Sequence, residues 1–213
     1  MEETNYIIDA EFSNMSAEVL RLANFVKRTE IYGPGMRSAI WVQGCTLACK
    51  GCWNTHMWSK KGGEDRSVIE LHEQLMKIED NEGITLLGGE PLQQSEAVLK
   101  LIKLQKAAGR TVMLYSGYEP EELDSVQQEC VDNSDIVILG RYKEELRNTK
   151  LRWRGSENQV LYSPTGRYTV EDFPDGETEI SVHIDADGKL LITGYPDLEY
   201  MMEIMDKITG ELL

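Results

Sequence analysis

The sequence has few cysteines, no basic apolar leader and no long apolar run, and each absence argues against a class of protein. Four cysteines among 213 residues are too few for a secreted fold held together by disulfides. The chain opens on the acidic segment MEETNYIIDAEF, whereas a secretory leader is basic and then apolar. No run approaches the roughly 18 apolar residues that cross a bilayer. We therefore expect a soluble, cytoplasmic protein without a membrane partner.

Basic residues are also scarce in this chain. Lys and Arg number 22 against 37 Asp and Glu, which gives a formal net charge of -15. Phosphate backbones require a basic surface, so a nucleic-acid partner is not expected, and acidic partners are disfavoured. No repeat or low-complexity stretch stands out, and 213 residues suit one compact unit. We expect residues 1–213 to form a single domain.

Three of the four cysteines lie together in the run GCTLACKGCWN. Cys45, Cys49 and Cys52 form a C-x3-C-x2-C triplet with no fourth cysteine nearby. Electron-carrying clusters and structural zinc sites are normally closed by four ligands, so three thiolates indicate a [4Fe-4S] cluster with one iron open to a small molecule. A zinc site completed by His56 is an alternative, although its ligands would all lie in one tight segment. We expect Cys130 to be a packed structural thiol.

A second motif, GITLLGGEPLQ, follows further along the chain. Residues 84–87 predict a short buried strand, and Gly88-Gly89 ends it in a turn where the backbone approaches whatever lies above the strand. Glu90 then stands at the carboxyl end of that strand, and Pro91 fixes the exit of the turn. A carboxylate beside free backbone groups suits the two ends of an amino acid. A plain strand-to-helix turn is the alternative for this motif alone.

Together the two motifs resemble those of the radical S-adenosylmethionine (radical SAM) superfamily. Five ordered segments are similar to the small activating proteins of anaerobic ribonucleoside-triphosphate reductase, over roughly residues 30–160. These segments are YGPGMR at 32–37, CWNTHMW at 52–58, GGEPL at 88–92, YSGY at 115–118 and WRGSENQ at 153–159. The aromatic Trp53 follows the last cysteine, and Gly51 precedes it, which is also the arrangement in those activators.

The resemblance implies an activity and a set of cofactor contacts. A [4Fe-4S] cluster would cleave S-adenosylmethionine reductively to a 5′-deoxyadenosyl radical, with flavodoxin or ferredoxin as electron donor and a glycyl-radical reductase as the radical acceptor. No catalytic side chain is implied beyond the cluster and the cofactor. The implied contacts are Gly51 and Trp53 on the adenine side, Gly88, Gly89 and Glu90 at the methionyl amino end, Ser116 near the ribose or carboxylate, and Cys52 as a cluster ligand beside them.

Two features differ from those activators and leave other functions open. Leu139 stands where the activators tend to have an aspartate before the glycine, and the chain continues to residue 213 beyond WRGSENQ. A free-standing radical SAM enzyme acting on a nucleoside, a small metabolite or a peptide is therefore a second hypothesis. A non-enzymatic iron–sulfur or zinc module is a third, although GGEP and the downstream segments argue against it. The candidate partner or substrate contacts are Arg154, Ser156 and Asn158, in a run that is equally suited to closing the last strand.

Apolar periodicity predicts strands that alternate with helices. We expect strands at 38–43, 84–87, 111–115 and 135–139, and helices at 67–80, 95–108 and 120–131, the last opened by Pro120. This alternation indicates an α/β fold of right-handed βαβ units, with functional loops at the carboxyl ends of parallel strands. Five or six such units would form a partial (β/α) barrel, which the resemblance also implies.

The remaining residues, 161–213, are expected to extend a core of about 30–160. The run EISVHIDADGKLLITGY alternates around Asp187-Gly188 and predicts a β-hairpin. Residues 197–209 place methionines on one face and predict a helix that packs on the barrel. We interpret Thr193-Gly194-Tyr195 as a turn.

Overall fold

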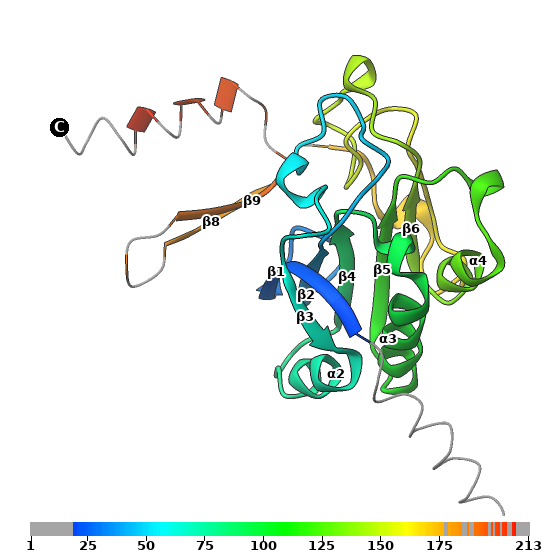
Figure 1. Cartoon of the computed structure of the whole chain (residues 1–213). Helices are drawn as coiled ribbons and strands as arrows, with labels where there is room; N and C mark the ends of the chain where they lie inside the picture. The colour runs from blue at the N-terminus through cyan, green and yellow to red at the C-terminus, as the bar shows by residue number, and fades with distance from the viewer. Residues whose placement is uncertain are drawn as a thin grey trace, which may run out of the picture.

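A computed structural model shows how the 213-residue chain folds. The structure describes residues 19–176, 179–184, 187, 190–195, 197, 199–200, 202–203 and 206–207. Within these residues, one sheet of seven strands forms the body in the order β3-β1-β2-β4-β5-β6-β7, and a two-stranded sheet of β8 and β9 projects from it (Figure 1).

The centre of the large sheet is parallel. Its strands are β2 (Arg37–Val42), β4 (Gly83–Gly88), β5 (Thr111–Ser116) and β6 (Ile136–Leu139), and they are connected by α2 (Val68–Met76), α3 (Ser95–Ala107) and α4 (Ser125–Asp132). The predicted α/β fold with parallel strand–helix units is thus confirmed.

Antiparallel strands extend this centre at both edges. They are β1 (Val19–Thr29) and β3 (Glu64–Ser67) at one edge and β7 (Val160–Tyr162) at the other. The expected five or six βαβ units were too many, because the described sheet has only three helical crossovers between parallel strands. The outer strands pair antiparallel with their neighbours and therefore need no crossover helix.

Both faces of the parallel strands carry buried apolar side chains, because successive side chains point to opposite sides. On one face, α2, α3 and α4 cover the largest apolar cluster, which includes Ile40, Leu86, Leu114 and Val137 (Figure 1). On the other face, the alternate positions form two smaller clusters. The strand residues are Ala39, Trp41 and Leu87 in one cluster, which Met57 joins from a short 3-10 helix, and Met113, Ile136 and Ile138 in the other. The helices therefore leave this second face available for a pocket.

The helix predicted at 120–131 is wrong in its first half. Pro120 opens only a short 3-10 helix, Pro120–Glu122, after which Leu123 is extended. Asp124 then caps α4, since its Oδ1 accepts hydrogen bonds from Val126 N at 2.9 Å and Gln127 N at 2.8 Å. The Gln127 side chain accepts from Asp124 N in return at 3.0 Å. This capping box fixes the start of the helix five residues later than predicted.

The extension confirms one prediction and corrects another. β8 (Ile180–Ile184) and β9 (Leu190–Gly194) pair antiparallel, as the alternating pattern predicted. Thr193 and Gly194 belong to β9 and not to a turn. The turn around Asp187-Gly188 and most of the helix predicted at 197–209 lie outside the described residues. In the part of the chain that is described, no helix combines the length and the apolar character needed to cross a membrane.

A buried arginine ties the YGPGMR segment to the sheet. The guanidinium of Arg37 donates to Thr85 Oγ1, to Pro34 O and to Ile84 O, each at 2.7 Å. The side chain is only 1% exposed, and burial lowers its pKa to about 10, so it remains charged at neutral pH. The planar fork of the guanidinium allows one side chain to reach three acceptors that point in different directions.

We predict that Arg37→Lys destabilises the fold by roughly 2–4 kcal/mol, because an ammonium group cannot reach all three acceptors and leaves buried oxygens without a donor. Urea denaturation at neutral pH measures the change. Arg28→Lys on the exposed end of β1 is the matched control and should cost far less. An equal loss in both variants would show that the hydrogen-bond fork of Arg37 contributes nothing specific.

Candidate functional site

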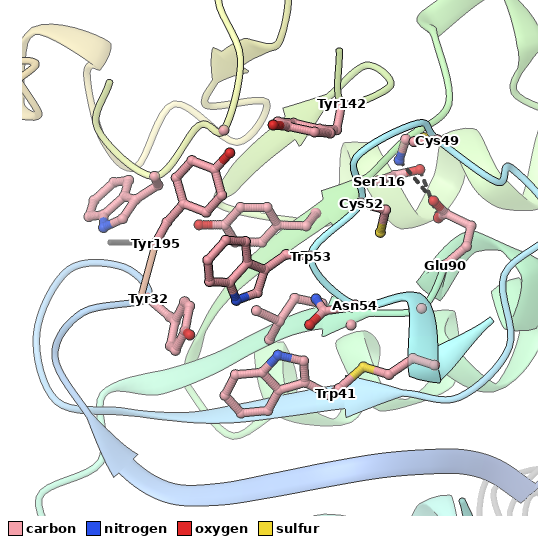
Figure 2. Close-up of a pocket in the computed structure, with 18 of the residues that line it drawn as sticks. Tyr32, Trp41, Cys49, Cys52, Trp53, Asn54, Glu90, Ser116, Tyr142 and Tyr195 are labelled. Atoms are coloured by element: carbon pink, nitrogen blue, oxygen red, sulfur yellow. Dashed lines mark hydrogen bonds between the residues drawn. The ribbon is translucent and has the colours of Figure 1, made fainter. Parts of the chain in front are cut away.

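The site is a pocket at the carboxyl ends of β2, β4, β5 and β6, on the face of the sheet opposite the helices. Its volume is about 460 Å³. Small-molecule and cofactor sites typically measure about 300–1,000 Å³. Cysteines, Ser116 and Glu90 line one side of the pocket, and aromatic rings line the other (Figure 2). The position agrees with the prediction that functional loops gather at this edge of the sheet.

The cysteine loop leaves β2 and is held by backbone hydrogen bonds. Gly44 N donates to Met57 O at 2.8 Å and Cys45 N donates to Trp58 O at 3.0 Å, so the short 3-10 helix Thr55–Met57 closes the loop. Within the loop, Cys52 N donates to Cys49 O at 3.2 Å. Cys45, Cys49 and Cys52 are all partly buried and all line the pocket.

The chemistry of this donor set fits an iron–sulfur cluster. Iron–sulfur clusters are bound by cysteine thiolates, and three cysteines line this one pocket. Burial raises the pKa of the Cys45 and Cys49 thiols. The fourth cysteine, Cys130, is fully buried on the helix side of the sheet, where its Sγ donates to Ser95 O at 3.3 Å.

Gly88 and Gly89 bring β4 against the start of the cysteine loop. A Cβ on Gly88 would lie 2.7 Å from Trp41 Cα, and one on Gly89 would lie 2.4 Å from Gly44 O. Gly89 N donates to Val42 O at 2.8 Å, and the next amide, Glu90 N, donates to Gly44 O at 2.9 Å. The predicted close approach of this turn is therefore directed at the neighbouring backbone, although both glycines also line the pocket.

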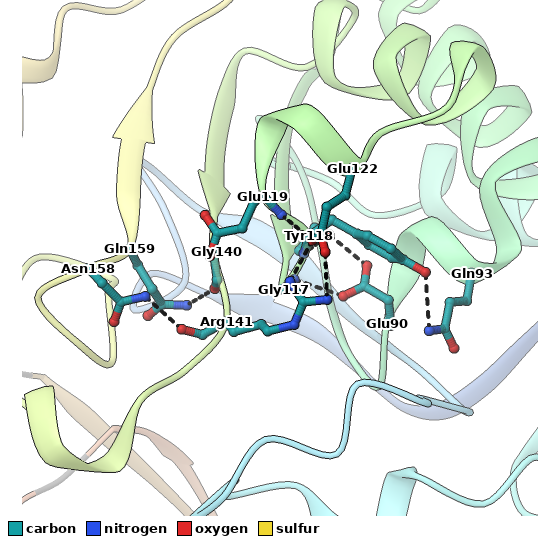
Figure 3. Close-up of polar contacts among 11 residues, drawn as sticks. Glu90, Gln93, Gly117, Tyr118, Glu119, Glu122, Gly140, Arg141, Asn158 and Gln159 are labelled. Atoms are coloured by element: carbon teal, nitrogen blue, oxygen red, sulfur yellow. Dashed lines mark hydrogen bonds and ion pairs between the residues drawn. The ribbon is translucent and has the colours of Figure 1, made fainter.

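Glu90 joins the loops that follow β4 and β5. Its Oε1 accepts from Leu92 N at 2.9 Å. Oε1 also accepts from Ser116 Oγ at 2.8 Å (Figure 2), and Oε2 accepts from Gly117 N at 2.8 Å (Figure 3). A carboxylate has about four lone-pair positions, so one acceptor position remains after these three bonds. Burial raises the pKa of Glu90 to about 7, while the hydrogen bonds from Gly117, Leu92 and Ser116 oppose that shift.

Two glutamines after GGEPL were missed by the sequence analysis. Gln93 Nε2 donates to Thr46 Oγ1 at 2.7 Å, and Gln93 Oε1 accepts from Thr46 N at 3.1 Å, which pins the cysteine loop. Gln94 Nε2 donates to Gln43 O at 3.2 Å and to Arg21 O at 3.1 Å. Their position directly after the motif was the only available signal in the sequence.

A third set of contacts fixes the loop after β6. Arg141 forms an ion pair with Glu122, with nitrogen–oxygen distances of 2.5 and 3.0 Å (Figure 3). Asn158 Nδ2 donates to Arg141 O at 2.8 Å, and Gln159 Nε2 donates to Gly140 O at 2.9 Å. The WRGSENQ segment therefore packs its amides against the residues that follow β6.

The candidate partner contacts occupy different environments. Arg154 lines the pocket, and its Nη2 lies 2.8 Å from both carboxylate oxygens of Asp175. Ser156 is fully buried, where its Oγ accepts from Lys143 N at 3.2 Å. Neither Ser156 nor Asn158 is among the residues that line the pocket.

Gly51 and Leu139 also lie outside the pocket lining. Gly51 is exposed and has a φ of 73°, and a Cβ there would lie 2.8 Å from the carboxylate carbon of Glu144, so it shapes the cysteine loop from its outer side. Leu139 is 1% exposed within the main apolar cluster, on the helix side of β6. The presence of leucine at position 139, where the activators tend to have an aspartate, therefore affects the core and not the pocket wall.

Aromatic rings from distant segments form the other side of the pocket. Trp53 is 43% exposed, whereas Trp41 is buried beneath it and meets Tyr32 edge-on at a centroid distance of 5.1 Å (Figure 2). Tyr115, Tyr142 and Tyr195 complete this side. Of these rings, the sequence analysis assigned only Trp53 to the site, although Tyr32 and Tyr115 begin the segments YGPGMR and YSGY.

Comparisons with known proteins agree with the geometry. A family model described as a 4Fe-4S single cluster domain matches residues 31–162. Anaerobic ribonucleoside-triphosphate reductase-activating proteins are similar over most of their own length. The protein from Escherichia coli K12 is 33% identical over 143 residues, covering 62% of this chain and 91% of the relative. Those from Vibrio cholerae and phage T4 are 34% and 37% identical, covering 62% and 63% of this chain and 90% and 88% of the relatives.

This chain belongs to the family of anaerobic ribonucleoside-triphosphate reductase-activating proteins. The predicted resemblance is thereby confirmed, and so is the [4Fe-4S] domain that the three cysteines indicated. The family match ends at residue 162, so the extension that contributes Tyr195 to the pocket lies beyond it.

We predict that Gly89→Ala lowers cluster occupancy, because its Cβ would collide with Gly44 O at the start of the cysteine loop. Overpacking of this kind costs about 1–3 kcal/mol, so the melting temperature should also fall. Iron per protein after anaerobic reconstitution measures the first effect. Gly176→Ala is the matched control, since a Cβ there meets nothing within 4 Å. Full iron content in Gly89→Ala would contradict the assigned contact.

We also predict that Glu90 makes the stability of the cluster-free protein depend on pH. Its folded-state pKa of about 7 lies above the ordinary 4.5, so its contribution is complete below pH 4.5 and is lost as pH rises through 7. The loss amounts to roughly 3 kcal/mol. Urea denaturation across this range should show the dependence in the wild type and in the exposed control Glu96→Gln, but not in Glu90→Gln. Parallel curves for the wild type and Glu90→Gln would refute it.

Proposed function

We propose that this chain is a radical SAM activating enzyme that installs a glycyl radical on an anaerobic ribonucleoside-triphosphate reductase. Membership in the activating-protein family supports the proposal. The observation that carries it is that three cysteines and the buried side chain of Glu90 line one pocket. This combination suits a cluster with an open iron and a small molecule that carries an amino-acid end.

The chain's own residues bind and orient the reactants. Cys45, Cys49 and Cys52 would hold three corners of the cluster. The remaining acceptor position of Glu90 would take the ammonium group of S-adenosylmethionine. When bound, the cluster would supply the electron for reductive cleavage of the S–C5′ bond of S-adenosylmethionine to methionine and a 5′-deoxyadenosyl radical.

The radical is then used outside this chain. Transfer of one hydrogen atom from a glycine Cα of the reductase would give 5′-deoxyadenosine and a stored glycyl radical. Each cleavage would consume the one electron that the cluster supplies, so an external electron donor would have to reduce the cluster again before the next turnover. We propose a reduced flavodoxin or ferredoxin as that donor.

The contacts to the cofactor and the partner are part of this proposal. Gly88, Gly89 and Ser116 would lie beside the methionyl end, and Trp53 beside the adenine. Gly51 would act by shaping the loop between Cys49 and Cys52. Arg154 is the candidate for direct contact with the reductase because it reaches the pocket, whereas Ser156 and Asn158 would hold its loop in place.

A second candidate function rests on the extension. Thr193 and Tyr195 lie beyond the family match and still line the pocket, so they change the space available to a substrate. A free-standing radical SAM enzyme that acts on a nucleoside, a small metabolite or a peptide would use such a wall for recognition.

Electron paramagnetic resonance distinguishes the two functions. We expect the reduced, reconstituted protein with S-adenosylmethionine to produce a glycyl-radical doublet on the anaerobic reductase of the same organism. Cys45→Ala should abolish the doublet through loss of the cluster. Cys130→Ala should keep the cluster and the doublet, because that thiol lies on the opposite face of the sheet. Cleavage of S-adenosylmethionine without any protein radical, together with deuterium transfer from a small molecule to 5′-deoxyadenosine, would favour the second function.

Arg154→Ala tests the proposed partner contact separately. The variant should weaken formation of the glycyl radical more than it weakens cleavage of S-adenosylmethionine in the absence of the reductase. Equal losses in both assays would assign Arg154 a structural role through its ion pair with Asp175.

A further inference from the structure

The extension beyond the family domain contributes directly to the pocket. The family match ends at residue 162, yet Glu179, Ile192, Thr193, Gly194 and Tyr195 are among the pocket residues. Curated relatives are matched over 88–91% of their own length by only 62–63% of this chain. This wall of the pocket is therefore an addition to the family domain.

Several polar contacts hold the extension against the domain. Asp175 Oδ1 accepts a hydrogen bond from Arg154 Nη2 at 2.8 Å, and Gly176 N donates to Lys150 O at 2.8 Å. At the open end of the hairpin, where β9 ends, Gly194 N donates to Tyr32 Oη at 2.6 Å. Tyr32 packs edge-on against Trp41 below the pocket, so the end of β9 is anchored to the floor of the site. Tyr195 follows immediately after this anchor.

Tyr195 enters a group of rings around an arginine. Arg147 Nη1 donates to Tyr195 Oη at 2.6 Å, and its guanidinium carbon lies 4.4 Å from the Tyr195 ring centroid. The same carbon lies 5.6 Å from the centroid of Trp53. Tyr195 meets Trp53 at a centroid distance of 5.9 Å and an interplanar angle of 69°, and meets Tyr142 at 6.3 Å and 76° (Figure 2). These edge-to-face contacts restrict how the indole can turn.

Trp53 joins this group of rings to the cysteine loop. It directly follows Cys52, and 43% of its surface is exposed, so the group leaves part of its indole available. An indole face that remains available stacks on a planar purine, and a neighbouring guanidinium strengthens such stacking. The orientation of the ring then determines whether a base bound next to the cysteines can stack on it.

We propose that Tyr195, held by Arg147, positions the indole of Trp53 against the adenine of S-adenosylmethionine, so that the extension completes the cofactor pocket. The inference rests on the proposed cofactor and is independent of the radical acceptor. Tyr195 is a positioning residue, since it acts through Trp53.

The affinity of the cluster-loaded protein for S-adenosylmethionine tests the proposal. We expect Tyr195→Ala to raise the Kd about tenfold, because it removes both the edge-to-face contact and the acceptor for Arg147. Tyr195→Phe keeps the ring and loses only the hydroxyl, so its Kd should rise less, by about two- to fivefold. Tyr200→Ala is the matched control, since Tyr200 lies in the same extension, is exposed and is not a pocket residue. Iron content should stay unchanged in all three variants.

A second measurement reports on Trp53 itself. The chain has four tryptophans, so the indole N–H signals of the cluster-free protein can be assigned one by one, that of Trp53 by its loss in Trp53→Phe. We expect the Trp53 signal to shift in Tyr195→Ala and to stay in place in Tyr200→Ala. An unshifted Trp53 signal, or a Kd for Tyr195→Ala within twofold of the wild type, would overturn the proposal.

The outcome is separable from that of the proposed function. Wild-type protein that binds S-adenosylmethionine in a Tyr195-dependent way but forms no glycyl radical would refute the activating function and support this inference. A normal glycyl radical with Tyr195-independent binding would do the opposite. Wild-type protein that carries the cluster and binds no S-adenosylmethionine would overturn both.

Discussion

The site depends on the hydrogen bonds of the buried residue Glu90, because they connect three segments of the chain. Glu90 receives donors from the turn after β4 and from Ser116 and Gly117 after β5, while its own amide reaches the first residue of the cysteine loop. A buried carboxylate is costly unless donors surround it. Here the donors belong to the loops that form the pocket. The hydrogen bonds that stabilise the buried Glu90 side chain therefore also hold these loops together.

The position of the cysteine loop is constrained in turn, because the backbone of β4 lies directly against the start of that loop. Gly88 and Gly89 allow β4 to lie against Trp41 and Gly44 more closely than any side chain would permit. Gln93 then holds Thr46 from the next turn. The cysteine loop itself has little regular structure, so its shape is set by these neighbours. The GGEP motif is therefore as much a support for the cluster loop as a contact for the cofactor.

Many of the secondary-structure elements and the cofactor motifs were predictable from local sequence. The parallel strands, α2 and α3 follow from apolar periodicity, and the cysteine spacing and GGEP motif indicated the cluster and the family. The prediction of a helix at 120–131 failed because Asp124 is a stronger N-cap than the residue before Pro120. The Asp124 carboxylate accepts hydrogen bonds from two backbone amides. The antiparallel edges were missed because the number of crossovers depends on which strands become neighbours, and local patterns do not report that.

The sequence by itself determined the ligand type, the order of the motifs and the α/β class, because thiolate spacing and side-chain periodicity are local properties. Only the tertiary structure decided that Glu90 points at Ser116 and Gly117, and that Tyr195 stands beside Trp53. The physical reason is the same in both cases. Contacts between residues far apart in the chain depend on how strands pair and where loops close. Neither can be predicted from the spacing between motifs.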